Sequence, residues 1–88
     1  MLKVDPEKLK EYFGKRLKEV RTENGYNQEQ VADIIGANKS TISRYENGIS
    51  SPGVSEVSLI SDKFNVNFYW LAGVSGEKYR LRGGLVKI

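Results

Sequence analysis

The chain has 88 residues, and 39% of them are hydrophobic, which suits one small helical domain and leaves no room for a second core. It contains no cysteine and no histidine, so the usual nucleophiles, general bases and zinc ligands are missing. No apolar run is long enough to span a bilayer. We therefore expect a cytoplasmic, non-enzymatic protein with no metal site, no cofactor and no membrane contact.

The net charge of +3 is unevenly distributed along the chain. Residues 1–73 contain ten basic and ten acidic side chains, whereas residues 74–88 contain four basic side chains and only one acidic. The body of the protein is thus not a general polyanion binder. If it binds DNA, the placement of a few side chains must provide the selectivity.

The first predicted helix runs from Pro6 to about Asn24. Asp5 is a suitable N-cap, and Pro6 stands at the first helical position, where a missing N–H costs nothing. Gly25 is placed to end the helix. Apolar residues recur at helical spacing and form one inward stripe, namely Leu9, Phe13, Leu17 and Val20.

Two short helices follow, over residues 28–35 and from Lys39 to about Asn47, with Asn27 and Asn38 as N-caps. Gly36 permits the tight turn between them. This spacing is typical of a helix-turn-helix, and its second helix presents donors suited to base edges and phosphates. The outward residues are Lys39, Ser40, Ser43, Arg44 and Asn47. DNA binding is the leading hypothesis.

A fourth helix is predicted from about Ser55, with Val57, Ile60 and Phe64 facing inward, and Asn65 can take the left-handed conformation after it. The fifth predicted helix is short, covers residues 68–72, is capped by Asn67 and ends at Gly73. We expect the helical domain to end there.

The remaining residues break the helical pattern and form a basic C-terminal tail. Segments 78–82 and 85–88 resemble two short strands around Gly83-Gly84, a β-hairpin pattern. In one alternative the tail is flexible, or is a linker. In the other, its Tyr79 and Leu81 side packs against the fifth helix or a second subunit while the basic side stays in solvent.

From Phe13 to Gly73 the chain resembles the phage-repressor and Cro-like helix-turn-helix family, also called the XRE family. The matching segments are GKRLKEVRTENGYNQEQVADIIG, STISRYENG and NVNFYWLAG. The resemblance implies an all-α, compact five-helix lambda-repressor-like DNA-binding domain over residues 1–73, with residues 74–88 as the tail. Members of this family bind operator DNA, usually as dimers, and regulate transcription.

The resemblance also implies roles for individual residues. Four residues would face the bases in the major groove, namely Lys39, Ser40, Ser43 and Arg44. Three would contact backbone phosphates, namely Gln28, Thr41 and Asn47. Arg21 and Glu46 match a structural ion pair seen in several relatives. Arg44 can bind guanine bidentately, but it could instead reach a phosphate.

Other interpretations remain open. The exposed side of the third helix could be an ordinary solvated face, and Lys15 or Arg16 on the first helix could provide a phosphate contact. The expected partners are double-stranded operator DNA and a second copy of the chain in a homodimer. Alternatively, the protein is an antitoxin that also holds a toxin protein through its tail, or an interaction module that has lost DNA binding.

Overall fold

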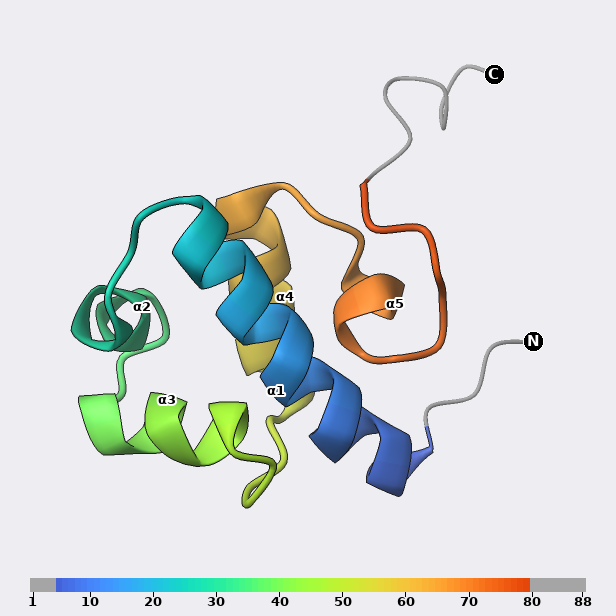
Figure 1. The fold of residues 1–88 in the computed structure, drawn as a ribbon, viewed down its shortest axis with the longest axis horizontal. Helices are drawn as coiled ribbons and strands as arrows, with labels where there is room; N and C mark the ends of the chain where they lie inside the picture. Colours follow the sequence, from blue (N-terminus) through green and yellow to red (C-terminus); the bar gives the residue numbers. More distant parts are fainter. Residues whose placement is uncertain (1–4, 80–88) are drawn as a thin grey trace.

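A computed structural model describes residues 5–79, which form five α-helices (Figure 1). The helices are α1 (Pro6–Glu23), α2 (Gln28–Ile34), α3 (Lys39–Glu46), α4 (Val54–Phe64) and α5 (Phe68–Leu71). The all-α fold predicted from the sequence is confirmed. Pairing of the extended type within residues 5–79 is limited to one isolated antiparallel bridge, between Val66 and Tyr79. The expected turn at Gly83-Gly84 and the second strand lie outside the described residues.

The predicted helix boundaries agree with the structure to within one or two residues, because side chains satisfy the first free N–H groups. Asp5 Oδ1 accepts a hydrogen bond from the Glu7 N–H at 3.0 Å. Asn27 Oδ1 accepts from the Gln30 N–H, and the Gln30 side chain accepts from the Asn27 N–H, each at 2.8 Å. This reciprocal pair is a capping box, and it fixes the start of α2.

Two left-handed residues set the changes of direction around the helix-turn-helix and after α4. Gly36 has a φ of +67°, which allows the chain to turn sharply between α2 and α3. Asn65 has a φ of +55°, so the left-handed conformation predicted for it is confirmed. The α4 helix begins at Val54, one residue before the expected start.

The core is formed by the inner faces of all five helices. Phe13, Leu17 and Val20 on α1 are fully buried, as the predicted stripe requires, whereas Leu9 is only partly buried. Apolar side chains from the other elements complete the cluster, namely Val31, Ala32, Ile42, Tyr45, Val57, Ile60, Val66, Trp70 and Leu71. None of the helices between Pro6 and Leu71 combines the length and the apolar character needed to cross a bilayer.

The closest approach of α1 to α3 takes place at Gly14. A Cβ atom added there would lie 2.2 Å from the backbone oxygen of Tyr45, a distance that no real side chain tolerates. Next to it, the Phe13 and Tyr45 rings meet edge to face, with centroids 5.4 Å apart. Gly14 therefore sets the distance between α1 and α3, a role that the sequence pattern did not indicate.

The two ends of the molecule carry different elements (Figure 1). The helices α2 and α3 lie at one end, and the segment from α5 to Tyr79 lies at the other, so the described chain ends far from α3. Tyr79 is 65% exposed, while the Lys78 side chain folds back onto α1. The alternative in which the Tyr79 side of the tail packs against a second subunit stays a prediction.

Candidate nucleic-acid interface

The α3 helix has one buried and one exposed face. Ile42 is fully buried and Tyr45 is 7% exposed, so these two side chains anchor α3 in the core. Lys39, Ser40 and Arg44 are exposed on the other side of the helix, and Ser43 is partly exposed. The four residues proposed to read bases are therefore accessible on one short helix that its inner face holds rigidly.

The two cations of this face have no partner among residues 5–79. No hydrogen bond or ion pair within this range engages the Lys39 ammonium or the Arg44 guanidinium, and both side chains are exposed to solvent. They are thus available for an anionic ligand without first breaking an internal contact.

The small hydroxyl residues at the start of α3 are engaged by the helix cap. Asn38 Oδ1 accepts from the Thr41 N–H at 3.1 Å, from Ser40 Oγ at 2.8 Å and from Thr41 Oγ1 at 3.1 Å. The hydroxyls of Ser40 and Thr41 therefore donate inward in this state. Their oxygens keep lone pairs that can accept from a ligand.

Asn47, directly after α3, has a similar local partner. Its Nδ2 donates to the Ser43 carbonyl oxygen at 2.9 Å, and it lies 3.4 Å from Ser43 Oγ. The side chain is exposed, and a phosphate oxygen would compete only with the long hydrogen bond to Ser43 Oγ for the second amide hydrogen. Asn47 thus stands at the end of α3 with a donor that a phosphate oxygen could use.

Glu46 is the centre of a buried polar network that connects three elements. Arg21 Nε donates to Glu46 Oε2 at 2.6 Å, and the second terminal nitrogen of Arg21 donates to Oε1 at 3.0 Å. The Arg21 and Glu46 side chains are 13% and 4% exposed. The hydrogen bond to Glu46 raises the pKa of Arg21 and outweighs the opposing effect of burial. The ion pair expected from the family resemblance is therefore present in the structure.

The same network includes the start of α2. Gln28 Nε2 donates to Glu46 Oε1 at 3.0 Å, and Arg21 also donates to the backbone oxygen of Tyr26 at 3.0 Å. One amide hydrogen of Gln28 is thus bound to protein, and one remains for the phosphate contact expected of it. Glu46 holds the end of α3 at a fixed distance from the start of α2.

The Arg16 guanidinium is engaged within the protein. Its guanidinium donates to the backbone oxygens of Trp70 at 2.6 Å and Ser75 at 3.0 Å. The guanidinium carbon also lies 4.8 Å from the Tyr12 ring centroid and 4.9 Å from that of Trp70. These contacts hold Arg16 against α5 and Ser75, and the phosphate contact considered for Lys15 or Arg16 stays a prediction.

The part of the chain from Asp5 to Tyr79 brings together no group of three His, Cys, Asp or Glu side chains able to hold a metal ion. The accessible polar side chains of this part lie instead on an open surface. A hollow of about 310 Å³ opens between the starts of α2 and α3, lined by Arg21, Asn27, Gln28, Glu29 and Lys39. This hollow is continuous with the outer face of α3 through Lys39.

Comparison with known proteins also identifies these helices as a helix-turn-helix. A model of the helix-turn-helix family matches residues 17–71, which include all of α2, α3 and α4. A stretch of 61 residues is 37% identical to the antitoxin PezA of Streptococcus pneumoniae and covers 69% of this chain and 39% of PezA. Another stretch of 55 residues is 34% identical to YonR, a prophage-derived helix-turn-helix transcriptional regulator of Bacillus subtilis, and covers 62% of this chain and 51% of YonR.

Among solved structures, the restriction-modification controller protein C.AhdI from Aeromonas hydrophila is similar, with a TM-score of 0.60 and 27% sequence identity. The similarity covers 67% of this chain and 86% of C.AhdI. The chain spans about two fifths to one half of the length of the curated relatives it matches. From the family match over residues 17–71 and the fold, the chain belongs to the helix-turn-helix family, in its phage-repressor and Cro-like branch.

Proposed function

We propose that the chain is a sequence-specific regulator of transcription, similar to phage repressors, that binds double-stranded DNA with α3 in the major groove. One observation carries this proposal: α3 is buried on one face and, on the other, presents two exposed cations without internal partners among residues 5–79. Residues 1–73 have no net charge, so these few side chains must provide the attraction to DNA.

The proposal divides the interface into two sets of contacts. Base contacts come from Lys39, Ser40, Ser43 and Arg44. Phosphate contacts come from Gln28, Thr41 and Asn47, which lie at the start of α2 and near the two ends of α3. The Arg21–Glu46 pair touches no DNA in this scheme. It fixes the angle at which α3 enters the groove.

The protein would act as a homodimer on a palindromic operator, with the two α3 helices about one turn of DNA apart. A regulator of this kind works in the cytoplasm and carries out no reaction. Support for the regulatory role comes from the relatives, which include a prophage-derived transcriptional regulator and a restriction-modification controller protein.

The test begins with selection of bound duplexes from random DNA by the purified chain. On the selected operator, Arg44→Ala should weaken binding by roughly 1–3 kcal/mol and relax the preference at one base pair. The matched control is Asn47→Ala, which should weaken binding to all sequences and leave the base preference nearly unchanged. The absence of any selected sequence, or an equal loss for Arg44→Ala on operator and random DNA, would contradict base reading by Arg44.

A second candidate function is that of an antitoxin. The 37% identity over 61 residues to the antitoxin PezA favours it. In this case the chain would bind DNA as above and would also hold a partner toxin through residues 74–88. Co-purification of a partner that is lost when residues 80–88 are deleted would support this candidate. A chain that purifies alone and has full operator affinity would argue against it.

A further inference from the structure

The chain leaves α3 through a fixed turn that ends at Ile49. Gly48 has a φ of +70°, and its N–H donates to the Tyr45 oxygen at 3.1 Å. The Ile49 N–H donates to the Arg44 oxygen at 2.9 Å. These two hydrogen bonds form a Schellman motif, which satisfies carbonyl groups in the last turn of the helix and fixes the Ile49 backbone relative to Arg44.

Ile49 is an apolar residue that the rest of the fold leaves open. In a Schellman motif, the residue at this position usually packs on an apolar side chain in the last turn of the helix. Here the corresponding residues are Ser43 and Arg44, and Ile49 is 64% exposed. It takes no part in the hydrophobic core that residues 5–79 form. Ile49 therefore keeps most of its apolar surface in water, at a position that the turn fixes.

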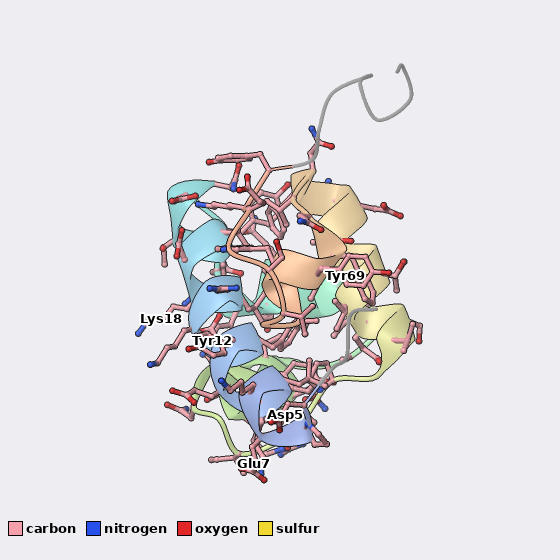
Figure 2. The ribbon with its side chains drawn as sticks, turned by 90° about the vertical axis from the view of Figure 1, so that its right-hand side faces the viewer. Asp5, Glu7, Tyr12, Lys18 and Tyr69 are labelled. Atoms are coloured by element: carbon pink, nitrogen blue, oxygen red, sulfur yellow. The ribbon has the colours of Figure 1, made fainter. Side chains whose placement is uncertain are left out.

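This position lies beside the DNA-binding face of the proposed function. Figure 1 shows the turn after α3 at the same lower edge of the molecule as α3 itself. The other large apolar side chains that are well exposed between residues 5 and 79 belong to α4, α5 and the segment after α5, namely Val54, Leu59, Tyr69 and Tyr79. Figure 2 looks onto the end that carries α5 and labels Tyr69 there. Ile49 is the member of this set that directly follows α3.

The sequence around Ile49 is free of cations. From Tyr45 to Asp62 the chain contains no lysine and no arginine. A DNA strand that passes the end of α3 thus meets no positive side chain from this segment. Binding of a phosphate by a cation releases counterions and makes affinity fall with salt, whereas an apolar contact releases none. The end of α3 is therefore suited to a contact of the second kind.

We propose that Ile49 packs against a deoxyribose of the DNA backbone, beside the phosphate that Asn47 contacts in the proposed function, on which this inference rests. Residues near the start of a recognition helix reach base edges, and Ile49 lies beyond the other end. A deoxyribose offers carbon atoms to an apolar side chain and is the same in every nucleotide. Ile49 therefore adds affinity without reading sequence and without releasing counterions.

The first test compares variants at position 49 on the selected operator. Ile49→Ala removes three carbon atoms and should weaken binding by about fivefold, whereas Ile49→Leu keeps the apolar volume and should bind like wild type. The preferred sequence and the salt dependence should be equal in all three proteins, because no base contact and no charge changes. Urea unfolding midpoints should also agree, since Ile49 is mostly exposed.

The second test uses a cation to report whether position 49 lies close to phosphates. Ile49→Lys should steepen the salt dependence of operator binding by about one unit of log K against log salt. The matched control is Gly76→Lys. Gly76 belongs to the segment after α5, at the other end of the molecule, and a Cβ there meets nothing within 4 Å. The control should leave the salt dependence unchanged.

A thymine methyl is the other apolar group of DNA within the grooves, and it has to be distinguished from the sugar. Replacing operator thymines one at a time by deoxyuridine removes these methyl groups. We expect each replacement to change the affinity of wild type and of Ile49→Ala by the same factor. A replacement that weakens wild type but not Ile49→Ala would show a base contact, and the deoxyribose assignment would be wrong.

Three further results would overturn the proposal: equal affinity of Ile49→Ala and wild type, equal salt dependence of Ile49→Lys and Gly76→Lys, or a change in the mass of Ile49→Ala in solution, which would place Ile49 between subunits. A failure of the proposed function is detected separately, as the absence of a preferred sequence in the selection experiment. Because every duplex contains deoxyribose, the same variants can then be compared on random-sequence DNA.

Discussion

The α1 helix makes ionic contacts with two other segments of residues 5–79, and these contacts differ in the exposure of their carboxylates. On one face, Arg21 pairs with Glu46 of α3, and the two side chains are 13% and 4% exposed. On another, Glu19 and Glu23 hold Lys78, and the two carboxylates are 46% and 48% exposed while Lys78 is 15% exposed. The cations are buried to a similar extent in the two contacts, and the difference lies in the carboxylates, which are far more open to water in the second.

The difference in exposure predicts a difference in the cost of breaking each contact. Removing a partner from a buried pair leaves a charge without solvent or counter-charge, which typically costs several kcal/mol. Removing a partner from an exposed pair returns the other charge to water, at a cost of roughly 0–1 kcal/mol. Single-residue variants on the two faces of α1 and on α3 can therefore test this difference in cost.

The largest effect is expected for Glu46→Ala. This change leaves the Arg21 guanidinium and the Gln28 amide without their shared acceptor, so we expect a loss of about 3–5 kcal/mol in the free energy of unfolding. Glu19→Ala is the matched control, because Lys78 keeps Glu23 and the loss should stay below about 1 kcal/mol. Urea unfolding measures both. Equal midpoints for the two variants would show that burial does not separate the two contacts.

A somewhat smaller effect is expected for Gly14→Ala. The added Cβ would collide with the Tyr45 backbone oxygen, and α1 would have to move away from α3, costing about 1–3 kcal/mol. Gly76→Ala in the segment after α5 is the control, because a Cβ there meets nothing within 4 Å. The free energies of unfolding of both variants would be compared by urea titration. If Gly14→Ala proved as stable as Gly76→Ala, α1 and α3 would not be as closely fixed as the comparison requires.

The parts of the fold that the sequence predicted are those set by local chemistry. The caps at Asp5, Asn27 and Asn38 and the left-handed Asn65 each depend on residues within three or four positions, and all are confirmed. The membership in the helix-turn-helix family, which depends on a continuous motif, is confirmed as well. The base and phosphate contacts stay predictions, since DNA is needed to test them.

The features that the sequence could not predict depend on residues far apart in the chain. Lys78 and Glu19 are 59 positions apart, and nothing local marks them as partners. Gly14 stands in a regular helical pattern, and the sequence alone does not reveal that α3 packs against α1 at this residue. The strand pattern also does not decide the outward position of Tyr79 in one chain, because it places Tyr79 and Lys78 on opposite sides but does not say which side faces the domain.

The smallest expected effect concerns pH and salt at the contact of Lys78 with α1. Burial lowers the pKa of Lys78, but the hydrogen bonds and charges of Glu19 and Glu23 outweigh burial and raise it above the ordinary value of about 10.5. A raised pKa means that the stabilising contribution of Lys78 is fully present below the ordinary value and is lost only as the pH rises through the raised one. The Lys78 ammonium lies 5.3 Å from the ring centroid of Trp70, the only tryptophan of the chain, so acrylamide quenching of Trp70 fluorescence reports whether Lys78 stays in place. This quenching should therefore stay constant from about pH 7 to pH 9.5.

Salt should weaken the contact of Lys78 with Glu19 and Glu23, whereas the change from pH 7 to pH 9.5 should not. At about 1 M NaCl the screening length falls to about 3 Å, so quenching of Trp70 in the wild-type protein should rise toward the level of Lys78→Gln at low salt. The variant itself should respond little, because it has lost the charge that salt screens. Helical content, followed by circular dichroism, should remain unchanged in all samples, since the Arg21–Glu46 pair is buried. A loss of helix at the same salt concentration as the rise in quenching would mean that residues 74–79 and the core open together, and the distinction between the two faces of α1 would not hold.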